Sequence, residues 1–133
     1  MRINGHNVWA IAVAAVAMYA IGALIYGVLF SAQWMALSGY SKDAFAGEEW
    51  RMALSPIMPV LIAVGLSLTI KWRAVSGWLP GALTGFWMGL LFSFAARMYN
   101  FTYGTEQPGL LAMDGAHLIL AAMVGGAILG AWK

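Results

Sequence analysis

Long apolar stretches separated by short polar connections dominate the chain. A helix needs about 20 mostly apolar residues to cross a bilayer, and the pattern predicts such helices over residues 8–30, 50–70, 78–98 and 110–132. The stretches are rich in Ala, Leu, Met and Gly, and they lack the alternating segments of about ten residues that are typical of outer-membrane barrels. We therefore expect a single all-α transmembrane domain over residues 1–133, built as a compact bundle of four helices.

The first span shares features with a signal peptide, because Arg2 precedes it and small Ala residues recur within it. Its apolar stretch is longer than the hydrophobic region of a typical signal peptide. We therefore expect a retained transmembrane helix.

The connection between the first two spans holds much of the polarity of the chain. Residues 38–43 read SGYSKD, which predicts a turn followed by a helix cap at Ser41 or Asp43. We expect a short interfacial helix after this cap, which would carry Phe45, Glu48, Glu49, Trp50 and Arg51.

Two prolines fall in the early part of the second span. Pro lacks a backbone N–H and is tolerated in the first turn of a helix, whereas in a helix interior it causes a kink. Pro56 and Pro59 therefore predict either that the helix restarts at Ser55 and Pro56 or that it is kinked there.

Composition supports the membrane assignment and excludes other classes. Hydrophobic residues make up 62% of the chain and charged residues only 9%, against about 25% charged in an ordinary soluble domain. A soluble domain of 133 residues could not bury so much apolar surface, so a soluble enzyme, a nucleic-acid binder and a disordered chain are excluded. The chain has no cysteine, and therefore no disulfide or thiolate metal site.

Charge is distributed unequally between the two sides of the predicted bundle. One side carries both termini and four cations, Arg2, Lys71, Arg73 and Lys133. The other side carries three cations and all five acidic residues, namely Lys42, Arg51, Arg97, Asp43, Glu48, Glu49, Glu106 and Asp114. The excess of Lys and Arg favours cytoplasmic termini in a bacterial inner membrane.

Glycines recur at four-residue spacing in the last two spans. Gly81, Gly85 and Gly89 form one ridge, and Gly126 and Gly130 form another. In lipid, such ridges let helix backbones approach closely. They predict either packing inside the bundle or contact with a partner, which would be another membrane subunit or a second copy of the chain.

Polar residues gather near the ends of the last two spans. Asp114 and His117 are three residues apart and share a helix face, which is compatible with a capped interfacial pair or with a proton or ligand site. Arg97 ends the third span, where it would reach lipid headgroups or pair with Asp114 or Glu106. A metal would need a third ligand, such as Glu48 or Glu49, and we expect none.

Two tyrosines of the first span form another candidate site. Tyr19 and Tyr26 are seven residues apart with Gly22 between them, so one helix face should carry both rings. This face predicts either a packed surface with bonded hydroxyl groups or contact with a ligand.

Several stretches of the first third of the chain resemble a bacterial membrane family, domain of unknown function 1761. They read NVWA at residues 7–10, GALIYGVLF at 22–30, WMALSG at 34–39 and SKDA at 41–44. Ile25 departs from the Trp that the family often has at this place. The resemblance implies a compact four-helix membrane protein and transfers no activity or catalytic residue.

Three functions are compatible with these features. We expect an accessory, scaffolding or assembly subunit of a larger membrane complex or homo-oligomer, which would contact partners through its glycine ridges. The alternative is a transporter or binder of a small apolar or amphipathic molecule. An enzyme using Asp114, His117 and Glu48 or Glu49 ranks third, because no catalytic motif is recognisable. We predict no cofactor, and a bound lipid or hydrophobic pigment stays open.

Overall fold

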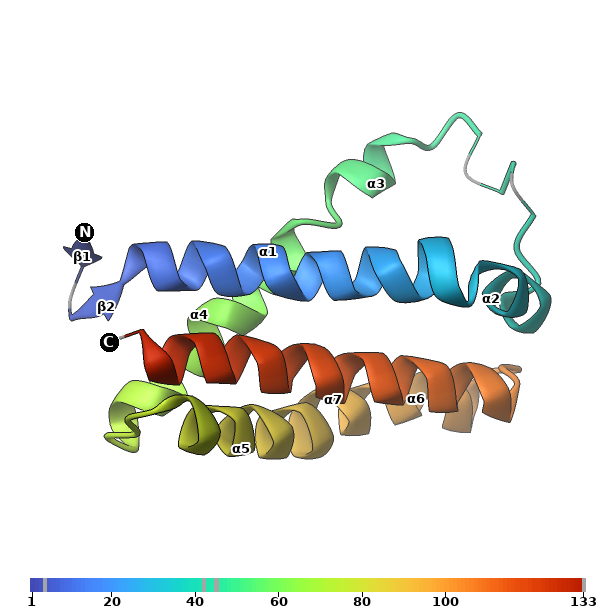
Figure 1. The fold of residues 1–133 in the computed structure, drawn as a ribbon. Coiled ribbons are helices and arrows are strands. Elements are labelled where there is room, and N and C mark those ends of the chain that lie inside the picture. The colour runs from blue at the N-terminus through green and yellow to red at the C-terminus, as the bar shows by residue number, and fades with distance from the viewer. Residues whose placement is uncertain (4, 42, 45, 133) are drawn as a thin grey trace.

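The long helical segments of the computed structural model lie side by side as a bundle, with both termini at the same end (Figure 1). The structure describes residues 1–3, 5–41, 43–44 and 46–132. Four segments are long and apolar enough to cross a membrane, namely Val8–Leu29, Trp50–Trp72, Trp78–Tyr103 and Pro108–Ala131. The predicted all-α membrane bundle of four spans is therefore confirmed.

The first span begins after a small antiparallel hairpin of β1 (Arg2–Ile3) and β2 (His6–Asn7). Asn7 caps α1 (Val8–Leu24), since its side-chain oxygen accepts a hydrogen bond from the Ala10 N–H at 3.3 Å. The span continues as the π-helical segment η1 (Ile25–Leu29), and α2 (Ser31–Ser38) then turns across the end of the bundle (Figure 1).

The remaining spans contain further breaks. The second consists of α3 (Trp50–Ala53) and α4 (Ile57–Trp72). The third consists of α5 (Trp78–Met88), the π-helical segment η2 (Gly89–Phe94) and α6 (Ala95–Tyr103), whereas the fourth is the continuous helix α7 (Pro108–Ala131). We call the end with both termini and the α4–α5 turn the termini end, and the end with α2 and the α6–α7 loop the acidic end.

A short helix lies between the first two spans as predicted, since Trp50 and Arg51 belong to α3, which leads into α4. The predicted start of this helix at Ser41 or Asp43 was wrong. A further short helix, α2, precedes this segment and ends where Gly39 adopts a left-handed conformation with φ 73°. The polar residues after it form successive turns instead, in which Ala44 N–H bonds Ser41 O and Ala46 N–H bonds Asp43 O. Glu48 and Glu49 precede α3 in this segment, and the predicted helix residue Phe45 lies outside the described residues.

The prolines of the second span mark a restart of the helix. Residues 54–56 form turns, and Pro56 occupies the cap position of α4. Pro59 lies in the first turn of α4, where backbone N–H groups have no partner within the helix, so the missing N–H of proline is harmless. Of the two predicted alternatives, the restart is correct.

The two glycine ridges bring α5 and α7 into backbone contact. A Cβ atom added at Gly81 would overlap the carbonyl oxygen of Gly126, and one at Gly85 would overlap the carbonyl oxygen of Ala122. A Cβ atom at Gly130 would lie 2.9 Å from Cα of Gly81. The Gly77 N–H also donates to Gly130 O at 2.8 Å, across the two elements.

Gly89 extends the same contact, because a Cβ atom there would lie 3.0 Å from Cα of Ile119. All five ridge glycines are buried inside the chain. Packing inside the bundle is therefore the role that the structure gives them, and these surfaces are not open to a partner.

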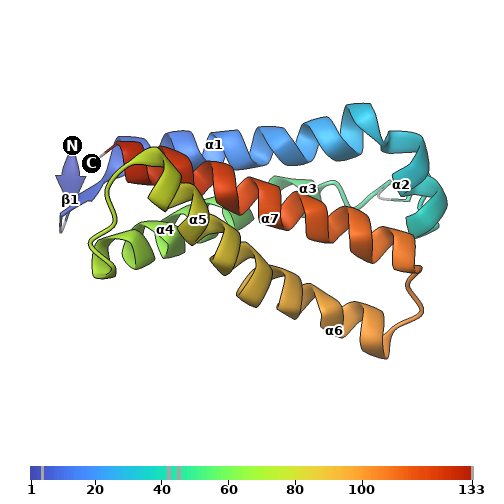
Figure 2. The same ribbon diagram turned by 60° about the horizontal axis from the view of Figure 1, so that its bottom comes forward.

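The third span diverges from α7 towards the acidic end. Figure 2 shows α5 close to α7 and α6 well separated from it. The glycine contact therefore closes the termini end of this helix pair and leaves a wedge at the acidic end, which larger side chains fill.

This packing predicts that a single methyl group at a ridge glycine destabilises the protein. Gly85→Ala should lower the free energy of unfolding by about 1–3 kcal/mol, because overpacking a tight contact forces the backbones apart. Gly65→Ala is the matched control, since Gly65 of α4 has no atom within 4 Å of the added Cβ position. Thermal unfolding in a mild detergent measures both, and equal effects of the two substitutions would contradict the assigned contact.

Candidate functional site

Five polar side chains meet in the wedge at the acidic end. Arg97 comes from α6, Glu106 from the α6–α7 loop, Asp114 and His117 from α7, and Tyr26 from η1. We call this group the Arg97 cluster. It joins the first, third and fourth spans.

Arg97 contacts two carboxylates at once. Its Nε donates to Oδ2 of Asp114 at 2.6 Å, and its Nη1 forms an ion pair with Oε2 of Glu106 at 2.5 Å. The side chains of Arg97, Asp114 and Glu106 are only 14%, 17% and 28% exposed. Removing a charged group from water costs free energy unless the charge is paired. The two ion pairs offset this desolvation cost for Arg97, Asp114 and Glu106.

Tyr26 connects this ion-paired group to His117. Its hydroxyl donates to Oδ1 of Asp114 at 2.7 Å and lies 3.2 Å from Nδ1 of His117. Since the hydroxyl proton is directed to Asp114, the second hydrogen bond requires Nδ1 of His117 to donate to the Tyr26 oxygen. Both oxygens of Asp114 therefore have partners within the cluster.

Small residues make room for this arrangement. A Cβ atom at Gly22 would lie 3.0 Å from Nε2 of His117, so the imidazole occupies the space beside α1 that this glycine leaves. Gly115 does the same for Phe94, whose ring would lie 2.7 Å from an added Cβ atom. The rings of Tyr26 and His117 pack edge to face with centroids 5.0 Å apart, which fixes both side chains.

A cavity of about 480 Å³ adjoins the cluster. Arg97, Glu106 and Asp114 form part of its wall, and Trp34 and Tyr40 stand on the α2 side with ring centroids 5.8 Å apart. Other lining residues are Leu37, Ser38, Gly39, Asn100, Thr105, Gln107 and Leu110. The cavity thus combines paired charges, neutral polar groups and aromatic rings.

The structure brings together some of the predicted site residues. Asp114 and His117 do share a face, and Arg97 pairs with both Asp114 and Glu106 rather than with one of them. Tyr26 joins them from the first span. The role of Trp34 and Tyr40 as cavity walls was not predicted, because the sequence shows an aromatic residue near a span end without showing which side it faces.

Other predicted residues lie apart from the cluster. Tyr19 is 45% exposed and its hydroxyl lies 3.2 Å from Oγ of Ser55, so it does not share a site with Tyr26. The two hydroxyl groups have partners on different spans, since Tyr19 contacts Ser55 before α4 and Tyr26 contacts Asp114 of α7.

Glu48 and Glu49 also remain outside the cluster. Glu48 forms an exposed ion pair with Arg51 at 2.8 Å. Glu49 accepts a hydrogen bond from the Gly47 N–H at 3.0 Å, which lowers the pKa of its carboxyl below the ordinary value. Within the described part of the chain, no three His, Asp or Glu side chains lie close enough to hold a metal ion.

Comparison with known proteins identifies the family. The family described as "Protein of unknown function (DUF1761)" matches residues 9–130. The chain belongs to the DUF1761 family. No significant match to a curated protein or to a solved structure was found.

The stretches on which the DUF1761 resemblance rests contribute directly to the site. The stretch over residues 22–30 supplies Gly22 and Tyr26, and the stretch over 34–39 supplies Trp34 and Leu37 of the cavity wall. Two of the four stretches therefore lie at the Arg97 cluster and its cavity.

The contacts of the Arg97 cluster predict that substitution of Arg97 strongly destabilises the protein. Arg97→Gln leaves Asp114 and Glu106 without their cation and should lower the free energy of unfolding by about 3–5 kcal/mol. Tyr26→Phe removes one hydrogen bond and should cost about 1 kcal/mol. Unfolding of the purified variants in detergent measures both effects.

Arg51→Gln is the matched control, because the ion pair of Arg51 with Glu48 lies at the surface. The two side chains are 55% and 52% exposed. Exposed ion pairs add little to the free energy of unfolding, so this variant should be as stable as the wild type. An Arg97→Gln protein as stable as Arg51→Gln would show that the cluster does not hold the acidic end together.

Proposed function

We propose that the protein binds a small amphipathic molecule with a positively charged head group in the cavity beside the Arg97 cluster. The observation that carries the proposal is a cavity of about 480 Å³ walled by two carboxylates, one guanidinium and two aromatic rings. Polar groups of this kind at a partly apolar cavity are typical of sites that orient a small ligand.

The charges of the cluster support a cationic head group. One guanidinium faces two carboxylates, so the ionised cluster carries an excess negative charge. Asp114 uses both oxygens inside the cluster, whereas Glu106 is the more exposed carboxylate, at 28% against 17%. We therefore infer that Glu106 is the group that contacts the ligand.

The other walls support an amphipathic ligand. Trp34 and Tyr40 present aromatic rings to the cavity, and aromatic faces attract organic cations. Leu37 and Leu110 add apolar surface beside them. The cavity lies at the ends of the spans, where a molecule with an apolar tail and a charged head group would reach it from the bilayer.

The expected accessory or scaffolding role stays a prediction and ranks second. Its main support was the pair of glycine ridges, and these now have partners within the chain. A subunit interface would have to use the faces that the bundle turns to the lipid. The sequence analysis gave a transporter or binder of a small amphipathic molecule as the alternative function. The present proposal retains the binding and does not require transport.

A ligand comparison in detergent tests the proposal. n-Octylamine should raise the midpoint of thermal unfolding by about 5 °C or more at concentrations near 100 times its Kd. n-Octanol and n-octanoate have similar tails and should give no comparable rise, because neither offers a cation to Glu106.

Glu106→Gln should abolish the rise, and Glu48→Gln should retain it, because Glu48 lies at the same end outside the cavity. Stabilisation of wild type by octanol or octanoate to the same degree would contradict a cationic ligand. An octylamine effect that survives Glu106→Gln would contradict this site.

A further inference from the structure

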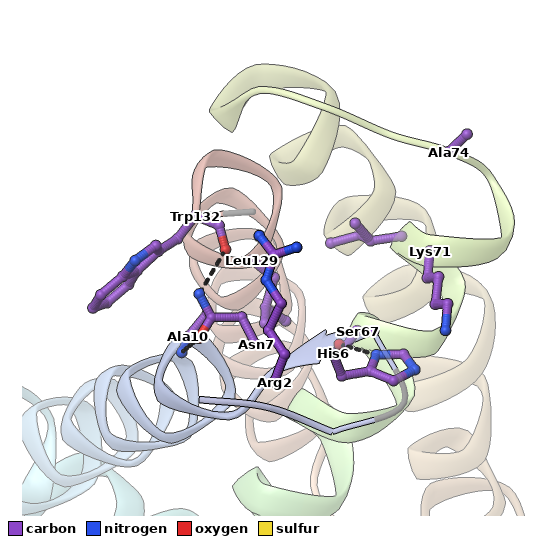
Figure 3. Close-up of a pocket in the computed structure, with 11 residues that line it drawn as sticks. Arg2, His6, Asn7, Ala10, Ser67, Lys71, Ala74, Leu129 and Trp132 are labelled. Carbon is purple, nitrogen blue, oxygen red and sulfur yellow. Dashed lines mark hydrogen bonds between the residues drawn. The ribbon is translucent and has the colours of Figure 1, made fainter.

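A second cavity lies at the termini end, far along the bundle from the Arg97 cluster. Its volume is about 300 Å³, and β1, β2, α1, α4 and α7 all contribute to its walls. Figure 3 shows Arg2, His6 and Lys71 arranged around this space, with Trp132 at one side. The proposed function does not use this cavity.

The walls of the termini-end cavity are cationic and rich in hydrogen-bond donors. Arg2 and Lys71 supply two positive charges, and Asn7, His6 and Ser67 supply polar atoms. None of its described lining residues is acidic.

The chain holds these groups in place. Nδ1 of His6 lies 2.8 Å from Oγ of Ser67, which ties the hairpin to α4. The amide nitrogen of Asn7 donates to Trp132 O at 3.4 Å, which ties the hairpin to the end of α7. Gly5 lies beside Lys71, since a Cβ atom there would be 3.0 Å from Nζ.

The end of α4 is also fixed. Val75 N–H bonds Ile70 O and Ala74 N–H bonds Lys71 O, each at 3.0 Å, which is the Schellman pattern of a helix C-terminus. Arg73 follows Lys71 and donates to Oγ1 of the buried Thr84 at 2.7 Å. The helix turn that carries Lys71 is therefore anchored to α5.

The depth of the cavity indicates the source of its ligand. Trp9, Trp72, Trp78 and Trp132 surround the termini end and are 63%, 76%, 65% and 47% exposed. Exposed tryptophans at span ends mark the headgroup level of a bilayer. Basic pockets between transmembrane helices at this level suit anionic lipid headgroups, and Leu129 and Ile70 add apolar wall.

We propose that the termini-end cavity binds the phosphate group of an anionic phospholipid. Arg2 and Lys71 contact the phosphate, and the hairpin closes over the headgroup from the side of His6. This site is separate from the amphipathic-cation site, so either proposal can fail without the other.

Native mass spectrometry of the protein with phosphatidylglycerol and with phosphatidylcholine of the same acyl chains tests the proposal. Wild type should bind phosphatidylglycerol about tenfold more tightly than phosphatidylcholine. The double variant Arg2→Gln, Lys71→Gln should lose this preference, and Lys71→Arg alone should keep it. Arg51→Gln, which removes a cation from the acidic end, should bind like wild type.

Two further results would overturn the proposal. A phosphatidylglycerol preference that persists in the double variant would place the lipid elsewhere. Displacement of the bound lipid by inorganic phosphate at equal molar concentration would show that the cavity takes a free anion rather than a lipid. Circular dichroism of the double variant checks that it remains helical, and Lys71→Gln alone provides a milder substitution, with a smaller loss of preference expected.

Discussion

Backbone contact between α5 and α7 is the constraint from which the rest of the bundle follows. In lipid no hydrophobic force draws helices together, so association depends on close packing and dispersion. Gly81, Gly85, Gly126 and Gly130 remove the side chains that would keep the two backbones apart. The contact is concentrated at the termini end, so α6 diverges from α7 at the other end of the pair (Figure 2).

The wedge that this divergence opens is where the polar chemistry of the chain is found. Arg97 reaches across it to Asp114, and Tyr26 reaches the same carboxylate from the first span. The first and third spans each contain a π-helical segment close to these residues, η1 around Tyr26 and η2 just before α6. Such segments are frequent at functional sites.

Much of the fold could be predicted from the sequence, because hydropathy and helix-breaking residues act locally. Span length follows from bilayer thickness, and the restart at Pro56 follows from the chemistry of proline. The pairing of Arg97 with acidic residues of the next span was also foreseeable, since a buried guanidinium needs a carboxylate. The shared site of Tyr19 and Tyr26 was not obtained, because spacing along one helix does not show which neighbouring span each hydroxyl contacts. The turns that keep Glu48 and Glu49 in solvent depend on Gly47, whose φ of 83° ends any helix there.

Two independent contacts hold the third span against the rest of the bundle, the glycine contact at the termini end and the Arg97 cluster at the acidic end. Electron paramagnetic resonance distance measurements in lipid nanodiscs test this arrangement directly, because the chain has no native cysteine to compete with spin labels. One label pair, Val28→Cys with Tyr103→Cys, reports on the acidic end. Another, Trp9→Cys with Trp78→Cys, reports on the position of α5 at the termini end. All four positions are exposed. Introducing Arg97→Gln should broaden the distance distribution of the first pair and leave the second unchanged. An unchanged first distribution, or equal broadening of both, would contradict the account.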